Sequence, residues 1–412
     1  MRELSSILLA AALLLAGCHS GRNGGPIEVS VIGERANAPA VAAAIDGATQ
    51  SGLVRLDREG QIIPGAAARW AILDDGLDYI FRIDDGAGLP AATIARRLRE
   101  ALRRHRHDPD FAALAAVESI EAVTATVVEM RLSAPQPDVL PLLARPEFSA
   151  DFPTPLRRPQ TKAASALLEA VPSADEAPYP VMLRTERVGR AVARFHAGEA
   201  LLVLGGTFAD LPVAHVIQPP RKALRFDLAT GLFGFAIVNQ QLSSPLRNAL
   251  SLAVDRDRIV AAVGAPGQAK ATTIAGSTLE SPLPQRRAAA RALLAGQPAL
   301  VRVAMPRGPG ARLLFALAAQ DWRDVGIEAQ MVPLDAPADL ALIDRVAPAG
   351  TLATLACALS TGCDPRDRLA LINPPFIPLA APVRWSLVAP SLDLFTENAL
   401  AAHPLDQLRS HR

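Results

Sequence analysis

The alternation of hydrophobic and polar positions predicts a chain that mixes β-strands with α-helices. Short alternating or β-rich runs favour strands, and apolar residues that recur every three or four positions favour helices. The predicted strands are 27–32, 79–83, 119–123, 125–132, 232–238, 300–304, 327–333 and 376–379, and 61–65 is extended and ends in a turn. The predicted helices are 91–106, a piece near 163–170, 244–263, 288–294 and 310–325. The pattern therefore indicates an α/β fold, without internal repeats.

Two of the predicted helices also indicate how they are placed in the fold or which surface they present. Helix 310–325 ends at Gly326 and lies between two predicted strands, which is typical of a βαβ unit. In helix 91–106, Ile94, Leu98 and Leu102 share one face and arginines occupy the rest. That basic surface suits either an anionic partner or plain solvation, and we favour solvation, because neighbouring acids such as Glu100 can pair with the arginines.

The N-terminus carries a localisation signal. Arg2 precedes a short apolar run that ends in Leu15-Ala16-Gly17-Cys18. A basic start, an apolar core and small residues before a cysteine are typical of a lipoprotein signal peptide. The apolar run is much shorter than the roughly 20 residues that cross a bilayer. We therefore expect cleavage after residue 17, lipidation of Cys18 and a periplasmic protein tethered to a cell-envelope membrane, the alternative being the start of a membrane helix.

Length and charge restrict the class of protein. The 412 residues exceed one small core and fit two lobes or domains. The formal net charge is +1, which gives no reason to expect a nucleic-acid partner. After Cys18, the remaining cysteines are Cys357 and Cys363. An oxidising compartment would allow these two to form a local disulfide, and two separate buried thiols are the alternative.

The sequence contains no convincing catalytic or metal-binding motif. His105 and His107 are close together but have no third ligand nearby, so a surface loop is the better interpretation. Asp84 and Asp85 precede Gly86 and are typical turn residues rather than a catalytic pair. G-x-S-x-G and H-E-x-x-H patterns are absent. We therefore expect a protein without catalysis, cofactor or metal.

Several segments in order resemble one known family. The segments 52–57, 61–70 and 74–86 are similar to the opening of the family 5 extracellular solute-binding proteins, the oligopeptide, dipeptide and nickel receptors of ABC importers. Further similarity lies in segments 236–239, 245–256, 320–327, 376–379 and 383–385. The chain is shorter than relatives of this kind around 171–180 and after Cys363. The resemblance covers most of the mature chain.

The resemblance implies a type II periplasmic-binding-protein fold, in which two α/β lobes close over a ligand cleft. The expected boundaries are 1–17 for the signal peptide, 18–25 for a flexible tether, 26–234 with 364–412 for lobe 1, and 235–363 for lobe 2.

The resemblance also suggests ligand-binding residues. In peptide-binding relatives an aspartate at an Asp-Pro loop pairs with the amino terminus of the ligand, and Asp364 is the residue that fits, with an ordinary turn as the alternative. Arg384 can fork onto a carboxylate. Trp385 is expected either to reach the ligand cleft or to lie in the core. Asn239 is expected either to donate a hydrogen bond to the ligand or to serve as a structural turn residue.

These expectations combine into one function and one alternative. The function is a lipid-anchored, non-catalytic binding protein that takes up a small peptide or similar solute with an ABC permease in the inner membrane. The alternative is a degenerate homologue that acts as an envelope scaffold and binds no small ligand.

Overall fold

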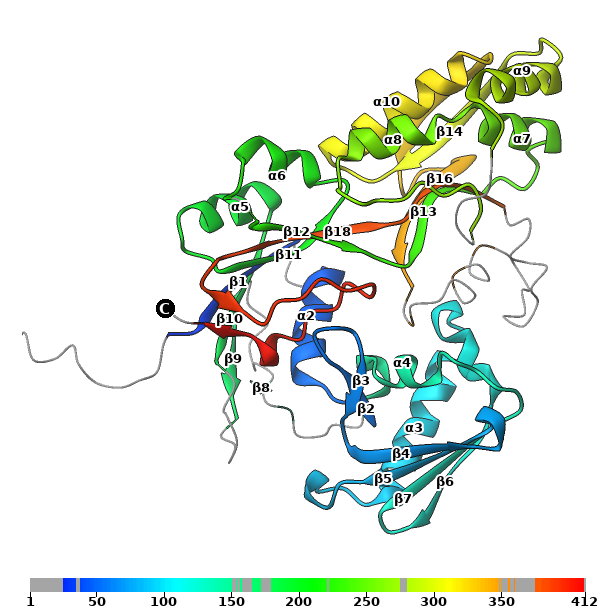
Figure 1. Cartoon of the computed structure of the whole chain (residues 1–412). Helices are drawn as coiled ribbons and strands as arrows, with labels where there is room; N and C mark the ends of the chain where they lie inside the picture. The colour runs from blue at the N-terminus through cyan, green and yellow to red at the C-terminus, as the bar shows by residue number, and fades with distance from the viewer. Residues whose placement is uncertain are drawn as a thin grey trace, which may run out of the picture.

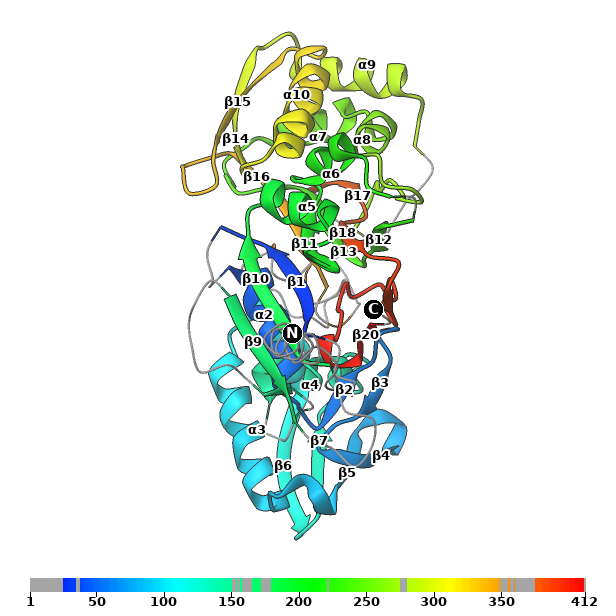
Figure 2. The ribbon, with the colours of Figure 1, turned by 90° about the vertical axis from the view of Figure 1, so that its left-hand side faces the viewer.

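The computed structural model describes residues 25–34, 38–149, 154, 156–157, 165–171, 179–220, 222–274, 280–347, 349, 355, 359 and 375–410. Cys18, Cys357, Cys363 and Asp364, which carry the predictions of lipidation, of a disulfide and of a ligand-binding aspartate, lie outside these residues. Figures 1 and 2 show a seven-stranded sheet between a four-stranded unit at one end and a five-stranded unit at the other. None of the described helices has the length and apolar character needed to cross a bilayer.

The seven-stranded sheet is the centre of the first lobe. Parallel pairing joins β1 to both β10 and β11, and the other neighbouring strands are antiparallel. In spatial order the strands are β12 (Leu224–Leu228), β18 (Val383–Val388), β11 (Leu202–Thr207), β1 (Ile27–Ile32), β10 (Val181–Glu186), β9 (Ser165–Ala170) and β8 (Leu156–Arg157). The helices of this sheet are α2 (Pro39–Thr49), α5 (Val188–His196) and α6 (Leu211–Ile217). Separate hydrophobic clusters pack around Val31 and around Trp385.

The four-stranded unit is antiparallel and has its own core. Its strands, in spatial order, are β4 (Ala67–Leu73), β5 (Asp78–Ile83), β7 (Val127–Leu132) and β6 (Val117–Thr124). Around them lie α3 (Ala91–His105), the 3-10 helix η4 (Pro109–Ala116), α4 (Val139–Leu143), the 3-10 helix η5 (Pro146–Phe148) and the ribbon of β2 (Val54–Leu56) and β3 (Ile62–Pro64). Strand β5 alternates between core and outward positions, and Tyr79, Phe81 and Ile83 are buried with Ile94 and Leu98 of α3.

The five-stranded sheet forms the second lobe. Its strands, in spatial order, are β15 (Ile327–Pro333), β14 (Ala299–Met305), β16 (Leu340–Val346), β13 (Gly231–Ile237) and β17 (Phe376–Ala380). Figure 1 shows its helices on the face turned away from the four-stranded unit, and they are α7 (Ser244–Ala253), α8 (Arg256–Val263), α9 (Leu283–Leu294) and α10 (Pro309–Arg323). The last two strands, β19 (Leu392–Asp393) and β20 (Arg409–Ser410), form a separate two-stranded ribbon outside this five-stranded sheet.

Two strand pairs carry the chain between the lobes. Strand β12 leads to β13 through Ala229 and Thr230, and β17 leads to β18 through Ala381 and Pro382. The two crossings are joined by a hydrogen bond from the Ala229 amide to the Pro382 carbonyl (3.2 Å). By sheet membership the crossings lie at 229–230 and 381–382, so β17 belongs to the second lobe, whereas the sequence placed the boundaries at 234/235 and 363/364.

Most predicted elements are found, and the βαβ prediction is confirmed. Strands β14 and β15 are parallel on either side of α10, and Gly326 after the helix adopts a left-handed φ of 93°. The helix predicted at 244–263 is two helices, because Asp255 caps α8 by accepting a hydrogen bond from the Arg258 amide (3.1 Å).

The helical piece predicted near 163–170 is wrong for its described residues. Residues Ser165–Ala170 form strand β9, which pairs with β10. Ala166 and Leu168 enter the core while Leu167 is 39% exposed, a period of two. The Ala-Leu composition favours a helix in isolation, and sheet pairing overrides that preference.

Candidate binding site at the lobe junction

The candidate site lies where the second lobe faces the first. On β13, Phe233, Phe235 and Ile237 pack under the helices, while Leu232 and Ala236 lie on the opposite face. That opposite face is turned towards the four-stranded unit in Figure 1. On this face, Leu232 and Ala236 pack in one apolar cluster with Ile274, Ala347, Leu355 and Phe376. The described part of the junction is therefore packed against apolar side chains.

An ion pair bridges the lobes across this junction. Arg345 of β16 lies on the same face as Ile343, and its Nη2 donates to both carboxylate oxygens of Asp110 in η4. Arg345 is 42% exposed and Asp110 28% exposed. Close by in sequence, Ala349 packs into the core of the four-stranded unit. The two lobes therefore touch at more than their crossing strands.

We expect the Arg345–Asp110 bridge to favour the closed arrangement weakly. Because both side chains are partly exposed, their coupling should be worth about 0.5–1 kcal/mol, and salt should weaken it. Asp110→Ala should increase the radius of gyration seen by small-angle X-ray scattering at low salt, and less so at high salt. Asp85→Ala, which removes an exposed pair with Arg82 inside one lobe, is the control. Identical scattering from both variants would contradict a bridging role.

Arg384 connects the same two lobes beside the crossing. It belongs to β18 of the first lobe, and its Nη1 donates to Asp344 Oδ1 of β16 (2.8 Å) while Nη2 donates to the Asp344 carbonyl (3.1 Å). Burial raises the pKa of the Asp344 carboxyl above its usual value, and the charge of Arg384 opposes that rise. The guanidinium fork predicted for a ligand carboxylate is thus occupied by Asp344, and a ligand would have to compete with it.

The side chains of Asn239 and Trp385 also make hydrogen bonds to other groups of the protein. Asn239 Nδ2 donates to Asp339 Oδ1 (2.8 Å), and its Oδ1 accepts from the Gln241 amide (3.0 Å). These contacts are those of a turn residue. Trp385 is fully buried, and its Nε1 donates to the Thr207 carbonyl (2.9 Å). It therefore occupies the core position that the sequence analysis gave as the alternative to the cleft.

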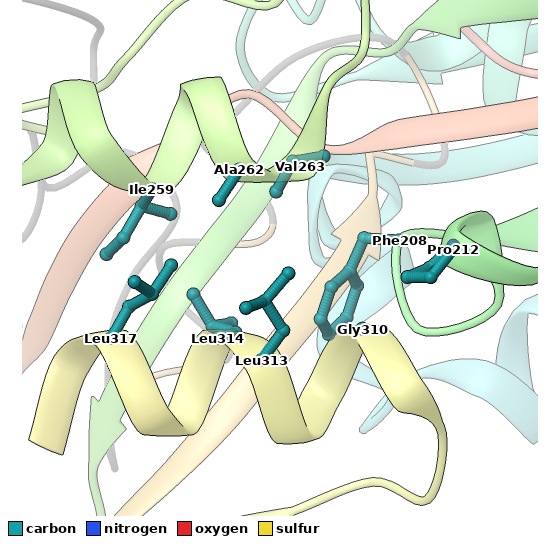
Figure 3. Close-up of a pocket in the computed structure, with 9 residues that line it drawn as sticks. All are labelled: Phe208, Pro212, Ile259, Ala262, Val263, Gly310, Leu313, Leu314 and Leu317. Carbon is teal, nitrogen blue, oxygen red and sulfur yellow. The ribbon is translucent and has the colours of Figure 1, made fainter. Parts of the chain in front are cut away.

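A second feature of the junction is the apolar seam in Figure 3, where Phe208 and Pro212 of the first lobe meet α8 and α10. Its volume is about 10 Å³, which holds at most about one water molecule. The Gly310 amide donates to the Ala209 carbonyl across the seam (2.9 Å). Next to it, burial raises the pKa of the Asp210 carboxyl. The seam is a packed contact between the two lobes and is too small for a ligand.

The sequence missed Asp110, Asp344 and Arg345. Strand β16 was not predicted, and its partners across the junction are far away in the chain, so spacing gave no signal. His105, which we interpreted as part of a surface loop, is the last residue of α3 and packs against Phe111 and Phe148. Within the described residues, no group of three or more His, Cys, Asp or Glu side chains is placed to hold a metal ion.

Solved structures share this architecture, although no family model and no curated protein matches the sequence. Haemophilus influenzae OppA, in complex with the peptide RPPGFSPFR, has a TM-score of 0.78 at 14% identity, and the match covers 94% of this chain and 100% of that chain. The Escherichia coli murein tripeptide binding protein MppA has a TM-score of 0.72 at 16% identity, with coverages of 95% and 99%.

Brucella suis NikA, in complex with Fe(III)-EDTA, has a TM-score of 0.70 at 17% identity, with coverages of 93% and 100%. These likenesses establish the fold. The chain has the two-lobed α/β fold of the periplasmic binding proteins, as the sequence analysis predicted.

Proposed function

We propose that this chain is a family 5 extracytoplasmic solute-binding protein that captures a peptide between its lobes and presents it to an ABC permease. The observation that carries the proposal is the fold match over 94% of the chain to OppA in complex with a nonapeptide. The paired crossings at 229–230 and 381–382 support it, because two lobes joined by short strands can close on a ligand as rigid bodies. The motif at Leu15–Cys18 supports a lipid anchor at Cys18 and a periplasmic location.

We further propose that Asp364 receives the amino terminus of the peptide. A carboxylate that pairs with an ammonium group in a desolvated site forms a charge-assisted hydrogen bond that offsets part of the cost of burial. Asn239 and Arg384 remain secondary candidates, because their polar atoms already bond to Asp339 and Asp344. Trp385 is the weakest of the four candidates, since its ring is enclosed in the core of the first lobe.

The prediction that tests this function is a saturable rise in thermal midpoint when the chain from His19 is mixed with di- to pentapeptides. A ligand bound by the folded state alone raises the midpoint by mass action. Muropeptides and Ni²⁺ complete the panel. Asp364→Ala should weaken peptide binding by about tenfold or more, the effect of losing a hydrogen bond between charged groups. Asp367→Ala, three residues further along, is the matched control, and equal weakening by both variants would contradict the assignment.

An envelope scaffold without a small ligand is a second candidate function. It is favoured by the apolar cover over Leu232 and Ala236 and by the Arg345–Asp110 bridge, which occupy the described face of the junction. A well-folded protein that shows no midpoint rise with any member of the panel would support the scaffold over the receptor.

A further inference from the structure

A cavity of about 280 Å³ lies in the four-stranded unit, between the end of α3 and the 3-10 helices η4 and η5. Its lining residues differ from those named at the lobe junction, although η4 also carries Asp110 of the Arg345–Asp110 bridge next to Phe111. Its volume is close to the lower end of the range for small-molecule sites, about 300–1,000 Å³. The residues that line it divide into an apolar wall and a basic mouth.

The apolar wall is built around three rings. Phe111 and Phe148 meet edge to face with centroids 5.1 Å apart, and His105 lies 5.3 Å from Phe111 and 5.8 Å from Phe148. Leu102 and Leu114 extend the wall. Phe148 is 0% and Phe111 6% exposed, so the rings form a closed floor, and the partly accessible apolar surface in front of them is that of Leu102 and Val117.

The mouth of the cavity is positively charged. Arg103 and Arg106 line it and are exposed. Arg103 has no polar partner in the part of the chain that the structure describes, and Arg106 Nε donates to His107 Nε2 (2.8 Å). No lining residue is acidic, and Asp108 is 3.8 Å from His105 Nδ1. A guanidinium group with free donors is suited to a carboxylate.

We propose that this cavity binds a small aromatic carboxylate, with the apolar body against Leu102 and Val117 in front of the buried rings and the carboxylate at Arg103 and Arg106. The wall alone would accept any small apolar molecule, and the mouth alone any anion. Together they select a ligand that carries both features. The site does not depend on the proposed peptide receptor function, because none of its residues belongs to the lobe junction.

The test measures calorimetric binding to the chain from His19, whose described fold begins at Gly25 and whose core begins at Ile27. The probes are 3-phenylpropionate, 3-phenylpropylamine with the same body and opposite charge, and inorganic phosphate with no body. We expect saturable binding of the carboxylate, at least about tenfold tighter than the amine or phosphate, as for one charge-assisted hydrogen bond. Equal binding of the amine or of phosphate, or no saturable binding of the carboxylate, would overturn the proposal.

Three variants locate the site. The double variant Arg103→Ala, Arg106→Ala should raise the dissociation constant of 3-phenylpropionate by about tenfold or more. Arg104→Ala, an exposed arginine of the same helix outside the lining, should change it by less than about twofold, since exposed charges far from a ligand are screened. Ala115→Trp should block the cavity. Unchanged affinity in the double variant or in Ala115→Trp would overturn the assignment, whereas Asp364→Ala should leave this affinity unaltered.

Discussion

Asp321→Ala is expected to destabilise the second lobe by about 3 kcal/mol, the lower end of the range for removing one partner of a buried charge pair. Asp321 lies in α10 and is fully buried. Its Oδ1 accepts from Arg258 Nη2 and from Arg287 Nη2, both at 2.6 Å, and its Oδ2 accepts from the Asp255 amide at 2.9 Å. One carboxylate thus ties α10 to the first turn of α8 and to α9.

The exposure of the two arginines decides the size of this effect. Arg258 is 38% exposed and Arg287 19% exposed, so water can reach part of each charge when the carboxylate is lost. Asp255 is the N-cap residue of α8, and its backbone amide donates to Asp321 Oδ2. Removing this carboxylate leaves the Asp255 amide without its acceptor, which adds the cost of an unsatisfied donor. We therefore place the loss near the lower limit for a buried pair.

Asp324→Ala is the control for this prediction. Asp324 belongs to the same end of the second lobe, is 32% exposed, and also accepts from Arg287 (2.8 Å). Its replacement should cost no more than about 1 kcal/mol. The measurement is denaturant unfolding followed by circular dichroism, compared by the midpoint of the first transition, because a chain of two lobes need not unfold in one step. Similar losses in the two variants would show that burial of Asp321 does not set its contribution.

The sequence predicted local elements well wherever their own pattern decided the conformation. The unit of β14, α10 and β15 follows from hydrophobic period and from Gly326. The residues 165–170 were assigned wrongly because Ala and Leu favour a helix locally, while the decisive pairing with β10 comes from 181–186. The division of the first lobe into a seven-stranded sheet and a four-stranded unit was not predicted, since the seven-stranded sheet takes strands from both sides of the stretch 67–132 that forms the four-stranded unit, and from the C-terminal part of the chain.

The candidate site was less predictable for the same reason. Arg384 was chosen for its guanidinium, yet its partner Asp344 comes from the other lobe and 40 residues earlier. Arg345 meets Asp110 across 235 residues. A sequence shows which groups can form ion pairs, and folding decides which of them remain available to a ligand. Polar residues that look free in a sequence are therefore weaker evidence for a site than polar residues without a partner in the fold.

Gly206→Ala is expected to destabilise the first lobe by about 3 kcal/mol, the upper part of the usual range for overpacking a core. Gly206 lies on β11 opposite Trp385 of β18, at an irregularity in the pairing of the two strands. A Cβ atom at Gly206 would lie 2.3 Å from two ring atoms of Trp385 and 2.6 Å from its backbone oxygen. The backbone oxygen belongs to the sheet and the ring is enclosed, so neither can move away without disturbing the core.

The matched control is Gly189→Ala in α5 of the same lobe, where an added Cβ would meet nothing within 4 Å. Gly189 is the second residue of α5, so alanine there should stabilise by no more than about 0.5 kcal/mol, the lower end of the range for a glycine inside a helix, and only Gly206→Ala should lower the thermal midpoint. The result also bears on the site. If Gly206→Ala proves harmless, the Trp385 ring must be able to leave its place against β11, and Trp385 becomes a credible ligand contact again. If the loss is as large as expected, the ring is fixed by the Thr207 carbonyl and the core, and recognition of a peptide has to rest on other residues, Asp364 first among them.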